Sequence, residues 1–199
     1  MADIDRKPKI AIIVGSTRAS RFADKPAQWM LEQAKAHGSF DVELVDVRDY
    51  DLPLFDEPAS NAWMPSQDPN AVRWQHKVGE FDGYIFVVAE YNHSLSGSLK
   101  NALDQAYVEW VHKPAAAIGY GGVGAARAIE HLRGIAVELQ MVPLRNAVHI
   151  AAGGFMKVHP MGENAAISEI EPQIKPAATA MLNELSWWAK ATMAARAND

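Results

Sequence analysis

The chain has 199 residues, of which 49% are hydrophobic, and it carries a formal net charge of −5 and no cysteine. The lack of cysteine excludes disulfides, thiolate nucleophiles and cysteine-ligated metal centres, and the acidic balance argues against binding along a nucleic acid. No window has the roughly 18 unbroken apolar residues of a membrane span, and residues 1–9 lack the apolar core of a signal peptide. We therefore expect a single domain over residues 1–199, located in the cytoplasm, with no membrane or nucleic-acid partner.

Strand-like and helix-like patterns alternate along the chain. In chain order, the predicted elements are a strand at 10–14, a helix at 22–35, a strand at 41–47, a helix at 71–80, a strand at 83–89, a helix at 96–108, a strand at 115–120, a helix at 125–139, a strand at 142–150 and a helix at 167–196. Ser96 or Ser98 would be the N-cap of the third helix, and Pro143 interrupts the last strand. Five strands alternating with five helices predict an α/β fold with a parallel sheet covered on both faces.

The loop at residues 15–21 connects the first predicted strand to the first predicted helix. Backbone N–H groups and the positive end of the helix dipole converge at such a place and favour an anion. Ser16, Thr17 and Ser20 add hydroxyl donors, and Arg18 adds a fixed positive charge. This pattern predicts a phosphate site that needs no metal, although a simple helix-capping turn is the alternative interpretation.

Two further loops follow strands of the predicted sheet, where ligands bind in open parallel sheets. Residues 90–101 follow the third strand and are rich in polar and small side chains. Residues 119–124 follow the fourth strand and include four glycines. Backbone without side chains lets amides approach a flat ligand closely.

Together these three loops resemble the NADPH-dependent FMN reductase family. The motifs are Gly15-Ser-Thr-Arg18, then Glu90-Tyr-Asn92 followed by Ser94, Gly97, Lys100, Asn101 and Asp104, and finally the glycine-rich turn at 119–124. The resemblance covers residues 9–139 and implies a flavodoxin-like fold, with a five-stranded parallel sheet in the order 2-1-3-4-5 and helices on both faces. The chain departs from the family at Ala89 and Ser96, where proline is usual, and at Tyr120, where a small polar residue is common.

The resemblance implies that the first loop holds the phosphate of FMN, through Ser16, Arg18 and Ser20 beside Thr17. It also implies that the other two loops flank the isoalloxazine ring, through Glu90, Tyr91, Asn92, Ser94, Gly121, Gly122 and Gly124. Backbone amides near Tyr91, Asn92 and Gly122 would stabilise the negative charge of the reduced ring. Since the cofactor itself supplies the redox chemistry, we assign no catalytic side chain.

The expected activity is transfer of hydride from NAD(P)H to FMN and on to a quinone, flavin or metal-oxyanion acceptor. The resemblance further implies a homodimer or homotetramer in which a neighbouring subunit closes the site. Trp63, Met64 and residues 155–159 are candidates for that wall.

Two other functions suit the same predicted fold: an FMN-binding electron carrier without its own substrate, and a redox-silent binding protein. Flavodoxins usually lack arginine in the phosphate loop and are strongly acidic, so Arg18 and the mild acidity favour the reductase. Residues 119–124 also match the dinucleotide fingerprint, but they lie in the fourth strand–helix unit instead of the first. The histidines show no metal-ligand spacing, and no metal site is predicted.

Overall fold

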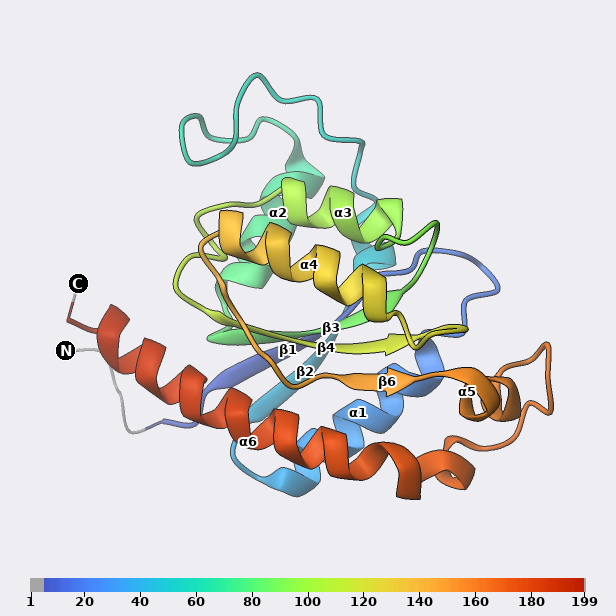
Figure 1. Ribbon diagram of the computed structural model, residues 1–199. Coiled ribbons are helices and arrows are strands. Elements are labelled where there is room, and N and C mark those ends of the chain that lie inside the picture. The colour runs from blue at the N-terminus through green and yellow to red at the C-terminus, as the bar shows by residue number, and fades with distance from the viewer. Residues whose placement is uncertain (1–5, 199) are drawn as a thin grey trace.

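A parallel β-sheet lies between two layers of helices (Figure 1). The computed structural model describes residues 6–198, so the predicted domain ends, residues 1–5 and 199, lie outside the described residues. The strands are β1 (Lys9–Val14), β2 (Asp41–Asp46), β3 (Gly83–Ala89), β4 (Pro114–Tyr120), β5 (Val142–Pro143) and β6 (Val148–Ile150). They follow the order β2-β1-β3-β4-β5, and β6 also pairs with β4. The predicted flavodoxin-like order 2-1-3-4-5 is confirmed.

Helices cover both faces of the sheet. They are α1 (Asp24–His37), α2 (Pro69–Gly79), α3 (Gly97–Asp104), α4 (Ala126–Glu138), α5 (Ala152–Val158) and α6 (Glu171–Arg196), with 3₁₀ turns η1 (Val47–Tyr50) and η2 (Ile167–Ile170). Helices α1 and α6 pack on one face, and α2, α3 and α4 pack on the other (Figure 1). Ile85 and Val87 of β3 point into the first layer, and Phe86 and Val88 point into the second. Burial on both faces explains why β3 is an unbroken apolar run.

Three predicted elements differ most from the structure, and helix α5 was not predicted. The strand expected over 142–150 forms two short segments separated by residues 144–147. Pro143 lies in the first segment, where the N–H groups of Val142 and Leu144 bond to the chain at the start of β4, so its missing N–H costs no bond to that strand. The third helix ends at Asp104, four residues before the predicted end. The last helix begins as the 3₁₀ turn η2, and Pro172 occupies the first turn of α6, where its missing N–H costs no hydrogen bond.

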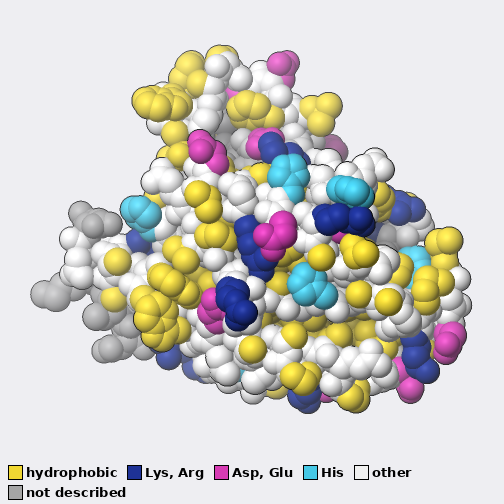
Figure 2. Space-filling view, viewed as in Figure 1, with side chains coloured by type: hydrophobic (Ala, Val, Ile, Leu, Met, Phe, Trp, Pro, Cys, Tyr) yellow, Lys and Arg dark blue, Asp and Glu magenta, His cyan; other side chains and the backbone are white. Residues whose placement is uncertain are grey.

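Residues 51–68 form a long loop that projects above α2 and α3 (Figure 1). Hydrophobic side chains gather on this part of the surface (Figure 2), and Leu54 and Trp63 are 83% and 85% exposed. Asn101 of α3 fastens the base of the loop, since its side chain donates to Pro53 O (2.7 Å) and accepts from Phe55 N (2.9 Å). No helix among residues 6–198 is both long and apolar enough to cross a bilayer.

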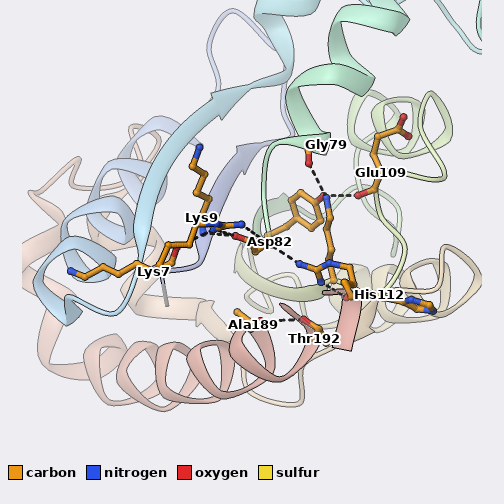
Figure 3. A network of polar contacts seen from close by, with 12 residues as sticks. Lys7, Lys9, Gly79, Asp82, Glu109, His112, Ala189 and Thr192 are labelled. Atoms are coloured by element: carbon orange, nitrogen blue, oxygen red, sulfur yellow. Dashed lines mark hydrogen bonds and ion pairs between the residues drawn. The ribbon is translucent and has the colours of Figure 1, made fainter. Parts of the chain in front are cut away.

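A polar network lies at the opposite end of the sheet from the strand carboxyl ends (Figure 3). Asp82, just before β3, is buried and accepts hydrogen bonds from Arg6, Lys9 N and Arg196. Nearby, the Lys113 ammonium donates to Gly79 O (3.2 Å) and to the Tyr84 hydroxyl (3.2 Å). Burial lowers the pKa of Lys113 to about 8. The network joins both ends of the described chain to the sheet.

Ser96 is the N-cap of α3 and also contacts the loop after β1. Its hydroxyl accepts from Leu99 N (3.3 Å) and donates to Gly15 O (3.2 Å), and Ser98 Oγ donates to the same carbonyl (2.6 Å). These bonds hold the start of α3 against the first predicted ligand loop.

We expect Ser96→Ala to lower the free energy of unfolding by about 1 kcal/mol, the usual cost of losing an N-cap hydroxyl. Urea denaturation measures this difference. Ser168→Ala, at an exposed serine of η2, is the matched control and should change the free energy by less than about 0.5 kcal/mol. Equal losses in the two variants would contradict the capping role.

Candidate functional site

A cavity of about 470 Å³ opens at the carboxyl ends of β1, β3 and β4. Its volume falls within the roughly 300–1,000 Å³ typical of small-molecule sites, and its position is the usual ligand site of an open α/β sheet. We call it the strand-end cavity. It is lined by Ser16, Arg18, Ser20, Arg21, Phe22, Ala89, Glu90, Tyr91, Tyr120, Gly121, Phe155, Met156, His159, Pro160 and Met161.

Arg21 fixes the loop between β1 and α1. Its side chain is only 6% exposed, and it pairs with the carboxylates of Asp24 and Asp46 and donates to Ser16 O (2.8 Å). The hydrogen bond to Asp46 is the main reason that the pKa of Arg21 is raised above its usual value. Because Asp24 and Asp46 already compensate its charge, Arg21 fixes the shape of the loop, although it also lines the cavity.

Arg18 is the second cation of the loop and has a different environment. It is exposed, its Nη1 donates to the Tyr91 hydroxyl (2.8 Å), and its Nη2 lies 3.5 Å from Ser20 Oγ. Among residues 6–198, no carboxylate is paired with Arg18. A guanidinium that lines a cavity without a carboxylate partner suits a bound anion.

The structure brings three of the four predicted phosphate ligands, Ser16, Arg18 and Ser20, to one wall of the strand-end cavity. Thr17 instead lines a separate cavity of about 380 Å³, together with Arg48 and Ser98.

A tight turn at residues 91–94 carries Tyr91 to the cavity. Tyr91 N donates to Ser94 O and Ser94 N donates to Tyr91 O, both at 2.9 Å, while Asn92 and His93 have positive φ of 50° and 66°. This is the geometry of a type I′ turn, in which asparagine is favoured. Asn92 and Ser94 do not line the strand-end cavity, and Ser94 Oγ bonds to His131 Nδ1 of α4 (2.7 Å).

Glu90 joins this turn to α4. Its carboxylate accepts from Arg127 Nε (2.6 Å), Arg127 N (3.2 Å) and Ala128 N (3.4 Å). These two amides belong to the first turn of α4 and have no partner within the helix. The Ala125 side chain offers them no acceptor. Glu90 therefore caps α4 from another loop and holds two ligand loops together, a role for which local sequence carries no signal.

The glycine-rich turn leaves bare backbone at the cavity. A Cβ added at Gly119 would lie 2.6 Å from Gly124 O, so only glycine lets the chain fold back there. Gly121 has φ +142°, and a Cβ at Gly121 or Gly122 would meet no atom within 4 Å. Gly121 lines the cavity, whereas Gly122 and Gly124 do not. The open backbone at Gly121 and Gly122 is suited to a flat ring system.

An aromatic wall forms the rest of the cavity; residues 155–159 were expected to help close the site and Tyr120 lies in the predicted glycine-rich turn, whereas Phe22 was not predicted. The Phe22 ring lies 5.2 Å from Tyr120 and 5.6 Å from Phe155, and Phe155 lies 4.6 Å from His159, between ring centroids. Burial raises the pKa of Tyr120, which keeps its hydroxyl neutral. The short helix α5 places Phe155 here, and its two glycines made it hard to predict because glycine disfavours helix.

The sequence profile of the NADPH-dependent FMN reductases matches residues 8–154. The chain belongs to this family. It is 34% identical over 154 residues to the NAD(P)H-dependent FMN reductase ntnL of a Nectria species. This alignment covers 73% of this chain and 77% of the relative. It is 37% identical over 142 residues to a 2-hydroxy-1,4-benzoquinone reductase of a Burkholderia species, covering 67% and 73% of the two chains.

A solved structure shares the fold of this FMN reductase. FerB, a flavoenzyme NAD(P)H:(acceptor) oxidoreductase from Paracoccus denitrificans, superposes with a TM-score of 0.68 at 22% identity, over 93% of this chain and 98% of that one. The family and its relatives establish an NAD(P)H-dependent FMN oxidoreductase, with FMN as cofactor, NAD(P)H as co-substrate and a small-molecule acceptor.

The residues of the strand-end cavity fit FMN. Arg18 and two serines offer donors for a phosphate, the backbone at Gly121 is open, and aromatic side chains form an apolar wall. The same cavity therefore has one polar and one apolar side, as a phosphorylated flat ring system requires.

Proposed function

We propose that the strand-end cavity holds FMN and that the reductase passes electrons from NAD(P)H to a quinone. The observation that carries this proposal is the aromatic wall of Phe22, Tyr120 and Phe155 beside Arg18, which has no carboxylate partner within residues 6–198. A planar apolar acceptor packs well on such a wall, whereas a metal oxyanion or another strongly hydrated acceptor gains little from it. Two relatives are named as quinone reductases, which supports the same acceptor class.

The phosphate of FMN would bind to Ser16, Arg18 and Ser20, with Thr17 next to them in the loop. Bound FMN supplies the two-electron chemistry, because its ring accepts and releases hydride. The chain orients it: Tyr91 and Gly121 line the ring site, and Glu90 keeps their two loops at a fixed separation.

The remaining predicted residues would support the ring site through the backbone. The Tyr91 amide is used within its own turn, which leaves the amides of Asn92 and Gly122 as the proposed donors to the reduced ring. Ser94 and Gly124 hold the two turns in position through His131 and His149.

We further propose a cytoplasmic homodimer or homotetramer in which a second copy covers the cavity. Trp63 and Met64 are 85% and 50% exposed on the projecting loop. Large exposed apolar side chains on one segment are typical of an interaction surface.

The first experiment is a visible absorption spectrum after FMN addition and desalting, followed by anaerobic NADPH and then an acceptor. We expect retained yellow colour, bleaching by NADPH, and faster reoxidation by 1,4-naphthoquinone than by chromate or free FMN. Retained flavin that NADPH does not bleach would support an electron carrier, and loss of all flavin would support a redox-silent protein. Faster reoxidation by chromate would contradict the proposed acceptor class alone.

A further inference from the structure

His159 lies in the wall of the strand-end cavity, beyond residues 8–154 that the family profile matches. Its ring lies 5.1 Å from Phe22 and 4.6 Å from Phe155, between centroids. Lys25 of α1 holds the adjoining chain in place, since its ammonium donates to Val158 O (2.9 Å) and Asn164 Oδ1 (2.7 Å). The imidazole is therefore positioned beside the start of α1, where the phosphate loop ends.

The hydrogen bonds of His159 define which nitrogen carries a proton. Met161 N donates to His159 Nδ1 (3.1 Å), so Nδ1 is an acceptor and the neutral ring carries its proton on Nε2. No acceptor among residues 6–198 is paired with Nε2. The cavity wall thus contains an N–H donor without a protein partner.

The charges around His159 favour its neutral form in the protein without a ligand. Burial, together with the positive charges of Lys25 and Arg18, lowers the pKa of His159 below its usual value. The carboxylates on the neighbouring elements are already engaged by other side chains: Asp24 of α1 with Arg21, Glu163 with Lys157, and Glu171 of α6 with Lys175. A doubly charged anion in the cavity would raise the pKa of His159, against the effect of burial and of the two positive charges, and so favour the imidazolium.

We propose that His159 donates its Nε2–H to the phosphate of FMN and takes up a proton on Nδ1 when FMN binds, so that Nδ1 gives up the hydrogen bond that it accepts from Met161 N. The proposal rests on the proposed function, because it places that phosphate at Ser16, Arg18 and Ser20. It adds a ligand from the C-terminal part of the chain to a site otherwise built from the loop after β1. The consequence is measurable: FMN should bind more tightly as the pH falls, as long as the phosphate stays a dianion.

The test compares FMN with riboflavin, which lacks the phosphate, by quenching of flavin fluorescence at pH 8 and pH 6.5. A phosphate monoester remains largely doubly charged above pH about 6. Binding that raises the pKa of His159 by one unit strengthens affinity by up to about tenfold at low pH. We expect the ratio of FMN affinity to riboflavin affinity to rise about threefold or more from pH 8 to pH 6.5.

Two variants isolate the side chain. In His159→Gln, which keeps a donor but cannot become charged, the affinity ratio should no longer depend on pH. His76→Gln, at an exposed position of α2, should behave like the wild type. The NMR shift of the His159 ring should also titrate at higher pH with FMN bound than without it.

A ratio that does not change with pH in the wild type, or an unchanged pH dependence in His159→Gln, would overturn the proposal while leaving FMN binding intact. Failure of the wild type to bind FMN at any pH would overturn the proposed function and this inference together.

Discussion

Arg18→Ala is expected to weaken FMN binding by roughly tenfold to a hundredfold, the scale of a hydrogen bond to a charged group. Arg21 cannot replace it, because Asp24 and Asp46 already engage its guanidinium. The Arg18 side chain is exposed and contributes little to the core, so the variant should fold normally. Titration of FMN against flavin fluorescence measures the loss.

Three comparisons make this result specific to the phosphate. Riboflavin affinity should not change in Arg18→Ala, and Arg145→Ala, at an exposed arginine after β5, should bind FMN like the wild type. Arg18→Lys should give an intermediate loss, because lysine keeps the charge without the two-pronged donor. Wild-type FMN affinity in Arg18→Ala would remove Arg18 from the site.

Asp82→Asn is expected to lower the free energy of unfolding by about 3 kcal/mol at pH 7, because it removes a buried carboxylate that pairs with two arginines. Asp82 accepts from Arg6 at 2.6 Å and from Arg196 at 3.1 Å, and it is 5% exposed (Figure 3). Because Arg6 and Arg196 are partly exposed, we expect a loss of stability at the lower end of the roughly 3–5 kcal/mol that breaking a buried ion pair costs. Thermal or urea unfolding of the two proteins measures the difference.

The pH dependence of this difference has a definite sign. Burial acts to raise the pKa of Asp82, but the hydrogen bonds from Arg6 and Lys9 N and the charge of Arg196 outweigh it and lower that pKa. A lowered pKa contributes stability above the unfolded-state value near 4, and that contribution is lost as the pH falls through the folded-state value. The gap between wild type and Asp82→Asn should therefore narrow below pH about 4.

Glu130→Gln is the matched control, since Glu130 pairs with Arg133 on the surface of α4 and is 71% exposed. Its loss should stay below about 1 kcal/mol. If both variants lost the same stability, burial would not be the source of the effect at Asp82.

The sheet could be predicted from the sequence because its strands are buried on both faces. The predicted range for β3, 83–89, coincides with the observed strand, and the loops after β1, β3 and β4 do meet at one edge. Parallel strands place their carboxyl ends together, so loops far apart in sequence could be assigned to one site.

The roles of individual side chains were less predictable, since they depend on contacts between distant segments. Glu90 has the position of a ring contact in the family motif, yet its carboxylate caps α4 some 37 residues later. Helix α5 has weak helix formers and gains its stability from packing, which local patterns do not reveal. The wall that it forms was predicted only as a candidate contributed by a neighbouring subunit.

The bonds from Lys25 to Val158 and Asn164 span 133 and 139 residues of sequence. During synthesis, the loop after β1 leaves the ribosome long before residues 155–161, which line the same cavity, and domains generally fold as units. A nascent chain that ends near residue 154 would contain the family motifs, Phe22 and Tyr120, but not Phe155, His159 or α6. The lining of the strand-end cavity is therefore complete only after residue 161 has been made, and we expect chains that end before it to retain flavin less well.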